Sequence, residues 1–283
     1  MLPLRINRRF LACLLAFVLW PLARGLTAPQ ATAWDQYTAD GFRAREAGHF
    51  PEAEENLKAA LKEADQFDPT DSRRAESLNN LAELYDTQGR YAEAASLVSR
   101  LLNIREQVLG LERPVVAEIA SSLANLYYAQ GKYAEAEPLF KRSLAVREKA
   151  LGPDHPDVAT SLNNLAALYR AQGKYAEAEP LLARSLAIRE KALGPDHPDV
   201  AQSLNNLAGL YYTTGKYADA EPLFKRSLAI WEKVLGPDHP DLAKSLESYA
   251  ELMRKTTRTA EAETLEARAK AIRAKLAQSK PDK

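Results

Sequence analysis

Apolar side chains recur along most of the chain at the three- and four-residue spacing of amphipathic helices. Leu162, Leu165 and Tyr169 place one apolar stripe on residues 156–172. A second stripe covers residues 175–193, through Tyr175, Ala178, Leu181, Leu182, Leu186 and Ile188. Because a single helix pair cannot bury both stripes alone, we expect neighbouring pairs to stack into a continuous array.

Glycine and proline mark the ends of these expected helices. Pro156 suits a first helical position, where its missing N–H costs nothing. Gly173 is expected to end the first helix in a left-handed turn, and Gly194 with Pro195 to end the second. Pro180 falls about one turn into the second helix, close to N–H groups that lack intrahelical partners, so it is tolerated there.

The same helix pair repeats along the chain. The motif Gly-Lys/Arg-Tyr-Ala recurs every 42 residues, at Gly89, Gly131, Gly173 and Gly215. Leu-Gly-Pro-Asp-His-Pro-Asp begins at Leu151, Leu193 and Leu235. We expect about six repeats with atypical ends, as a capped solenoid requires. Their expected bounds within residues 34–278 are 34–70, 71–112, 113–154, 155–196, 197–238 and 239–278, followed by a tail at 279–283.

The repeat resembles the tetratricopeptide repeat in the longer form found in kinesin light chains. The matching residues are Leu165, Ala166, Tyr169, Gly173, Tyr175 and Ala178, with their counterparts in the flanking copies. The Leu-Asn-Asn-Leu-Ala run and the Leu-Gly-Pro-Asp-His-Pro-Asp linker point to the light-chain subtype. The resemblance implies an all-α fold, a right-handed α-solenoid of about six antiparallel helix pairs. It also implies that the first helices of the pairs (helices A) line a concave groove, while the second (helices B) lie outside.

The first 33 residues are typical of a Sec-type bacterial signal peptide. Arg5, Arg8 and Arg9 precede an apolar run at 10–22, which is shorter than the roughly 20 residues of a membrane span. Small-residue cleavage sites follow at Ala31-Thr32-Ala33, which we favour because the helical pattern begins at Trp34, and at Ala23-Arg24-Gly25. An uncleaved anchor, a twin-Arg signal and a lipoprotein at Cys13 are the alternatives. The sequence predicts a periplasmic or secreted protein, with no membrane attachment after cleavage.

Charge and cysteine content narrow the function classes. Without the four leader arginines, 34 basic residues face 38 acidic ones, so nucleic-acid binding is not expected. The single cysteine lies in the leader, which removes a thiolate nucleophile and a cysteine zinc site from the body. We expect no enzyme, no cofactor and no metal.

Two recurring features resemble chemical sites, and each has a simpler structural interpretation. His155, His197 and His239 recur at the repeat period, but ligands of one metal must converge, so we expect linker residues that help to start a helix. Glu177 and Glu179 lie two apart on a helix and do not face each other, so we expect a solvated first turn.

Asparagine pairs in helices A are the candidate binding residues. Asparagine is a modest helix former that favours caps. Its recurrence in the middle of helices therefore indicates a specific role. An amide both donates and accepts, which suits an extended peptide backbone. For Asn79, Asn163 and Asn205 a bond to the neighbouring repeat is an equal alternative, whereas at Asn80, Asn164 and Asn206 we favour peptide contact. The candidate peptide-binding residues are Asn79, Asn80, Glu83, Ser122, Asn125, Asn163, Asn164, Arg170, Asn205, Asn206 and Tyr212.

Variation between copies supports a recognition surface. Residues 152–193 and 194–235 differ at only 10 of 42 positions. Three differences fall on the expected groove stripe, at Thr160/Gln202, Ala167/Gly209 and Arg170/Tyr212. Drift at exposed positions gives the same pattern. We expect no carboxylate clamp. Glu76, Glu83, Glu118 and Glu251 are expected to make the ends of the groove acidic, which suits a partner segment with some lysine or arginine.

The sequence thus predicts an exported protein–protein interaction module, an adaptor or assembly scaffold. Its expected partner is another protein, bound through an extended segment in the asparagine-rich groove. The alternative is a structural solenoid that self-associates without a peptide ligand, with Trp231 as a candidate contact on the convex face. We expect a monomer or weak self-association.

Overall fold

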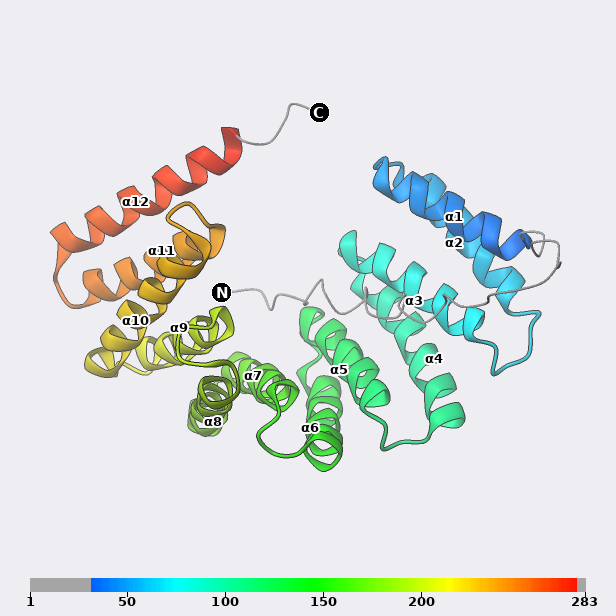
Figure 1. Ribbon diagram of the computed structural model, residues 1–283, viewed down its shortest axis with the longest axis horizontal. Coiled ribbons are helices and arrows are strands. Elements are labelled where there is room, and N and C mark those ends of the chain that lie inside the picture. The colour runs from blue at the N-terminus through cyan, green and yellow to red at the C-terminus, as the bar shows by residue number, and fades with distance from the viewer. Residues whose placement is uncertain (1–31, 279–283) are drawn as a thin grey trace, which may run out of the picture. The chain divides into compact units, whose positions relative to one another are not determined.

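The computed structural model describes residues 32–278, and this part of the chain consists of helices without strands. The expected signal peptide lies almost entirely outside the described residues, as does the expected tail at 279–283. The helices shown in Figure 1 are α1 (Ala33–Glu46), α2 (Phe50–Ala64), α3 (Ser72–Thr87), α4 (Tyr91–Leu109), α5 (Pro114–Ala129), α6 (Tyr133–Leu151), α7 (Pro156–Ala171), α8 (Tyr175–Leu193), α9 (Pro198–Thr213), α10 (Tyr217–Leu235), α11 (Pro240–Lys255) and α12 (Thr259–Gln278).

These twelve helices among the described residues confirm the all-α solenoid of about six helix pairs. Pro156 is the first residue of α7, and the chain leaves the helix through Gly173, whose φ is +76°. α8 ends at Gly194 with a φ of +86°. The glycines are required there because L side chains rarely adopt these backbone angles.

Within residues 32–278 the chain forms two compact units, which divide within α6 between Val146 and Arg147. In each unit a helix B packs between two helices A: α4 contacts α3 and α5, and α10 contacts α9 and α11. In the C-terminal unit α7, α9 and α11 form one layer and α8, α10 and α12 the other (Figure 1). The layering places helices A side by side, so that their outward faces form a common surface within the unit.

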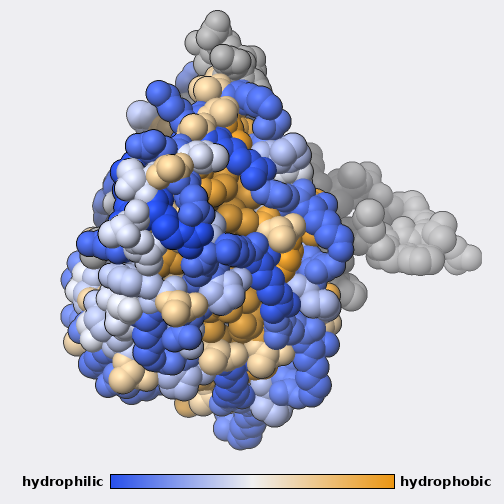
Figure 2. Space-filling view, turned by 90° about the vertical axis from the view of Figure 1, so that its left-hand side faces the viewer, coloured by the Kyte–Doolittle hydropathy of each residue, from blue (hydrophilic) through white to orange (hydrophobic). Residues whose placement is uncertain are grey.

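Each unit has its own apolar core. The N-terminal core includes Leu57, Leu84 and Val116, all fully buried. The C-terminal core includes Leu204, Phe224 and Leu246, which are at most 1% exposed. On the face of the molecule shown in Figure 2, hydrophilic residues surround a band of hydrophobic ones. None of the described helices combines the length and the apolar composition needed to cross a membrane.

The Gly-Lys/Arg-Tyr-Ala motif joins successive repeats. Lys216 lies over the ring of Tyr211, 5.2 Å from its centroid, and donates to Glu179 of the preceding repeat at 2.7 Å. Arg90, Tyr85 and Glu54 make the same arrangement in the N-terminal unit. Arg90 and Lys216 therefore each contact an aromatic face of their own repeat and a carboxylate of the repeat before it. Glu179 therefore bonds to the next repeat, and the prediction that it belongs only to a solvated first turn is wrong.

The linker histidines cap the helices that follow them. The Nδ1 atoms of His155 and His197 accept hydrogen bonds from the backbone N–H groups of Asp157 and Asp199, both at 3.1 Å. His239 makes the same bond. The expectation of a helix-starting residue is confirmed by this geometry, since such a bond satisfies one of the N–H groups that a helix leaves unpaired.

The prediction that Trp231 is a contact on the convex face is wrong. Its side chain is only 5% exposed and stacks on His239, with ring centroids 6.4 Å apart. Arg189, at the same repeat position, is also buried and donates to the backbone oxygen of Asp199 and to Ser203 Oγ, both at 3.0 Å. This position faces the next helix A, because helix B packs between two repeats.

Candidate functional site

The outward faces of helices A carry a polar stripe in each unit. Positions four and then three residues apart share one face of a helix, opposite its apolar core. The N-terminal stripe consists of Glu76, Asn80 and Glu83 on α3 and Glu118, Ser122 and Asn125 on α5. The C-terminal stripe consists of Thr160, Asn164, Ala167 and Arg170 on α7, Gln202, Asn206, Gly209 and Tyr212 on α9, and Lys244, Ser248 and Glu251 on α11.

Asn163 and Asn205 lie beneath the C-terminal stripe and connect helices. Both are buried. Asn163 Nδ2 donates to Ser185 Oγ on α8 at 2.7 Å, and Ser185 Oγ in turn donates to the carbonyl of Ala159 at 2.8 Å. Asn205 Oδ1 accepts from Ser245 Oγ of the next repeat at 3.0 Å. Asn163 Nδ2 also lies 3.5 Å from Ser203 Oγ of the next repeat, so the contacts of both residues favour the bond between repeats as their role.

Asn164 and Asn206 keep part of their side chains at the surface. Both are half-buried. Asn206 Oδ1 accepts from Gln202 Nε2 at 2.9 Å, and Asn206 Nδ2 lies 3.5 Å from Asn163 Oδ1 of the preceding repeat. The amide of Asn206 is thus oriented by its neighbours while remaining accessible to a ligand.

Arg170 and Tyr212 lie at corresponding positions of successive repeats, beside residues of the next helix A. A Cβ atom built on Gly209 would lie 3.7 Å from Nη2 of Arg170, so the guanidinium lies against the α9 backbone. Burial and the charge of Glu251 raise the pKa of Tyr212, whose ring centroid is 5.9 Å from that of Tyr217. Two of the three stripe positions that differ between the closest copies, Ala167/Gly209 and Arg170/Tyr212, therefore lie on one stretch of surface.

The N-terminal stripe contains amide atoms without a hydrogen-bond partner. Asn80 is 7% exposed, and its Nδ2 has no partner within the described residues. The same holds for the buried Oδ1 of Asn125, whose side chain is half-buried overall. Asn79 is half-buried, and Ser122 is exposed and donates to the carbonyl of Glu118 at 3.2 Å.

Carboxylates share the outward faces of α3 and α5 with these amides. Glu83 pairs with Arg45 of α1, with N···O at 2.9 Å. Glu76 is exposed, yet the surrounding protein and the charge of Asp35 raise its pKa.

Sequence reasoning missed Arg45 and Thr38, which lie beside this stripe on α1. They belong to the divergent first copy, whose Gly48-His49-Phe50 replaces the usual motif, so their register was not assigned. The spacing of Gly48 and Gly89 would have aligned Thr38 with Asn79 and Arg45 with Asp86.

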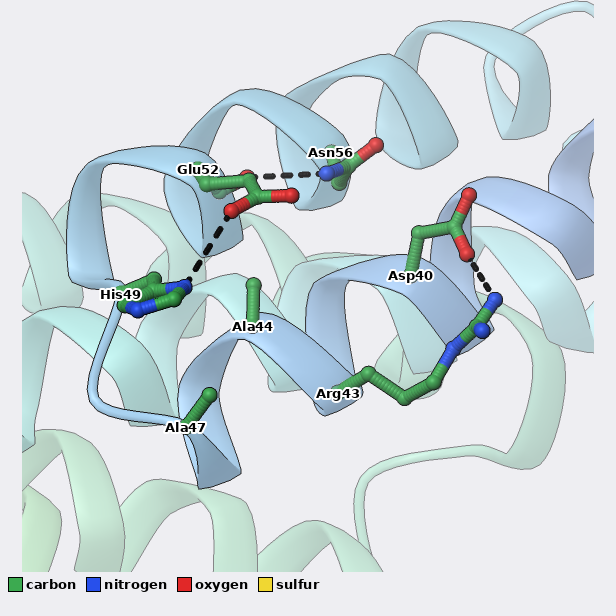
Figure 3. Close-up of a pocket in the computed structure, with 7 residues that line it drawn as sticks. All are labelled: Asp40, Arg43, Ala44, Ala47, His49, Glu52 and Asn56. Atoms are coloured by element: carbon green, nitrogen blue, oxygen red, sulfur yellow. Dashed lines mark hydrogen bonds and ion pairs between the residues drawn. The ribbon is translucent and has the colours of Figure 1, made fainter.

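A shallow depression elsewhere holds none of the predicted residues. It lies at the α1–α2 turn and is lined by Asp40, Arg43, Ala44, Ala47, His49, Glu52 and Asn56 (Figure 3). Its polar groups pair among themselves: Asp40 with Arg43, His49 with Glu52 at 3.5 Å, and Asn56 with the carbonyl of Glu52. Within residues 32–278 no three His, Cys, Asp or Glu side chains are arranged to hold a metal ion.

Known structures share this architecture. One is a Podosopora anserina chain described as a kinesin light chain with nearly identical TPR-like repeats, 28% identical, with a TM-score of 0.63 over 74% of this chain and 99% of that one. Another is BtubC (BKLC) from P. vanneervenii, 26% identical, with a TM-score of 0.65 over 89% and 95%. A Rap protein complexed with competence and sporulation factor shares the fold at 19% identity, with a TM-score of 0.54 over 90% and 78%.

The comparison with curated proteins gave no match. The family model for the tetratricopeptide repeat matches residues 42–107, 115–191, 162–230 and 207–275. Repeats of this family typically act as protein–protein interaction modules, and the structural neighbours are of the kinesin-light-chain-like kind. The matches cover most of the repeats that the glycine spacing predicts, and the chain therefore belongs to the tetratricopeptide repeat family.

Proposed function

We propose that this protein is an exported adaptor or assembly scaffold that holds an extended segment of another protein against its polar stripes. The observation that carries the proposal is the recurrence of accessible amides at one register of α7 and α9. Asn164 and Asn206 are half-buried there, while the asparagine before each is used to join helices.

An extended segment suits this chemistry. A strand-like chain offers N–H and C=O groups at regular intervals, and an amide side chain can pair with either. One structure that shares the fold is of a Rap protein complexed with competence and sporulation factor. For the present chain we propose contact through the predicted site residues that remain accessible, above all Asn164, Asn206, Arg170 and Tyr212.

A catalytic role has no support in these residues. Scaffolds of this family are generally not enzymes. The recurring histidines, which are the most conspicuous candidates for chemistry, have their Nδ1 atoms engaged in helix caps.

Export is the part of the proposal that rests on the leader sequence. The start of α1 adds a constraint on where the leader is removed. Thr32 Oγ1 accepts from the N–H of Asp35 at 3.3 Å, and Asp35 accepts from the N–H of Thr32 at 2.7 Å, which is a capping box. Cleavage after Gly25 keeps this cap, whereas cleavage after Ala33 removes it. We therefore expect the exported protein to begin at Leu26, and sequencing of its N-terminus tests this.

A pull-down with matched variants tests the binding function. The bait is the exported chain from the native cell envelope, crosslinked before lysis. The test variant carries Asn80→Ala, Asn164→Ala and Asn206→Ala. The control variant carries Ser96→Ala, Glu135→Ala and Lys270→Ala, at exposed positions of helices B.

The proposal predicts a partner that both the wild type and the control capture and that the stripe variant loses. Equal capture by all three chains would place binding elsewhere on the molecule. Recovery of the bait alone, with a mass that grows with concentration, would support a self-associating solenoid instead.

A further inference from the structure

The two stripes differ in the hydrogen bonds that their asparagine side chains make. In the C-terminal unit Asn206 Nδ2 reaches Asn163 Oδ1 of the repeat before it, at 3.5 Å. In the N-terminal unit the residue before Asn80 at the corresponding position is Thr38, because Gly48 and Gly89 align the two copies. The threonine side chain is shorter, and neither Thr38 Oγ1 nor Asn80 Nδ2 has a hydrogen-bond partner within the described residues.

An amide in this position is costly unless something bonds to it. Asn80 is 93% buried, since only 7% of it is exposed. A buried donor left without an acceptor destabilises a fold by about 1–3 kcal/mol. The neighbouring helix adds a buried acceptor without a partner, Asn125 Oδ1. A donor on α3 and an acceptor on α5 are the two groups that a peptide backbone requires.

The charged residues of the N-terminal stripe are all acidic. Glu76 is one turn before Asn80 on the same face of α3, and Glu118 is the one charged residue in the sequence of α5. The cations of the adjoining segments are already paired: Arg45 with Glu83, Arg73 with Asp71 and Arg74 with Asp65. Asp35 of α1 lies close enough to Glu76 to act on its titration.

The C-terminal stripe has neither property. Of its asparagines, Asn206 is engaged with Gln202 and with Asn163 of the preceding repeat. Its charged residues have both signs, since Arg170 and Lys244 are basic and Glu251 is acidic. A ligand selected by unsatisfied amides and negative charge therefore finds them together on α3 and α5.

We propose that the N-terminal stripe is the primary binding site and that its ligand is an extended segment rich in lysine or arginine. The inference rests on the proposed function, because it names the place and the chemistry of the bound segment. The ligand backbone bonds to Asn80 and Asn125, and its cationic side chains pair with Glu76 and Glu118. Such charge complementarity selects the partner and raises the association rate.

Peptide binding to the full exported chain tests the proposal. The probes are three fluorescent ten-residue peptides that differ at alternate positions, with lysine, glutamate or serine there. Affinity is measured by fluorescence anisotropy at low and at high salt. The variants are Glu76→Gln with Glu118→Gln and Asn80→Leu in the N-terminal stripe, and Asn164→Leu in the C-terminal stripe. Ser96→Ala, at an exposed position of α4 outside both stripes, is the control. Circular dichroism and the unfolding midpoint show whether each variant is folded.

The lysine peptide is expected to bind most tightly and to weaken at high salt. Glu76→Gln with Glu118→Gln should weaken it by about tenfold or more, the loss of two charge-assisted contacts. Asn80→Leu should weaken it without lowering the unfolding midpoint, and should do so more than Asn164→Leu. Ser96→Ala should leave the affinity unchanged.

Other results distinguish the failure of the N-terminal site from the failure of the peptide-binding function as a whole. Lysine peptide that binds the double glutamine variant as tightly as the wild type overturns the inference. Preference for the glutamate or serine peptide, lost with Asn164→Leu, also overturns it but leaves a peptide-binding function in place. Failure of all three peptides, with the envelope pull-down recovering only further copies of the chain, rejects both.

Discussion

Asparagine illustrates how one residue type takes two roles at adjacent positions of the repeat. Asn163 is buried with both its amide groups engaged, whereas Asn80 is buried with its Nδ2 unsatisfied. We expect Asn163→Leu to lower the free energy of unfolding by about 1–3 kcal/mol, because Ser185 and Asn206 lose their partner. Asn80→Leu should be neutral or stabilising. Urea unfolding of the two variants checks this, and a larger loss for Asn80→Leu would contradict it.

Thr257 occupies a position that glycine holds in the other repeats. Its φ is +63°, and Gly131, Gly173 and Gly215 have φ values of +73°, +76° and +77° at the corresponding turn. A side chain in this left-handed conformation costs about 1–2 kcal/mol. Thr257→Gly should therefore raise the free energy of unfolding by about 1 kcal/mol, less the extra entropy of glycine in the unfolded chain. Gly215→Thr is the matched reverse change and should be destabilising; a gain from it would refute the strain argument.

At the level of whole helices, the linker histidines stabilise the starts of α7, α9 and α11. His197 Nδ1 accepts the N–H of Asp199 at the start of α9. His197→Ala should destabilise by about 1 kcal/mol, as the loss of other N-cap side chains does. His197→Asn supplies another capping acceptor and should retain most of the stability. Equal losses in the two variants, measured by thermal unfolding, would mean that the cap bond contributes little.

Contacts between successive helices B and A make the stack sensitive to acid. Lys225, Arg258 and Tyr249 lower the pKa of Glu221 to about 2 from an ordinary value of 4.5. Because the folded pKa is depressed, this stabilisation is complete above pH 4.5 and is lost as the pH falls towards 2. The partners are partly exposed, so we expect a contribution of about 1 kcal/mol.

Glu221→Gln isolates that contribution. The variant should be less stable than the wild type at pH 6, and the difference should shrink as the pH falls below the ordinary pKa of glutamate. Unfolding by urea at a series of pH values measures both curves. A difference that stays constant down to pH 2 would show that the carboxylate contacts of Glu221 do not drive it.

The sequence predicted the helices well because their signals are local. Gly173, Gly194 and Pro156 act on the backbone of their own turn, so the bounds of α7 and α8 follow from them. Contacts across repeats were harder. Helical periodicity assigns Trp231 and Asn80 to a face of a helix, but it does not say how closely the next repeat covers that face. Trp231 is therefore buried where exposure was expected, and the unsatisfied Asn80 depends on the length of a side chain 42 positions earlier, Thr38.

At the scale of the whole molecule, similar repeats carry different chemistry. The two units share the helix pairs, the glycine turns and the motif cations. Their stripes differ: α3 and α5 present carboxylates beside unsatisfied amides, and α7, α9 and α11 present satisfied amides with mixed charges. A repeat framework of this kind is held by local packing, so the outward positions of helices A are free to specify a partner.

Site-specific photocrosslinking tests the central claim, that partners bind to the polar stripes of helices A. Ser122 on α5 and Ser96 on α4 are both exposed serines of the N-terminal unit, one on the stripe and one on a helix B. A photoreactive amino acid at Ser122 should yield an adduct with a segment of another protein, identified by mass spectrometry, and the same group at Ser96 should not. An adduct from Ser96 alone, or only crosslinks between copies of this chain, would contradict the account.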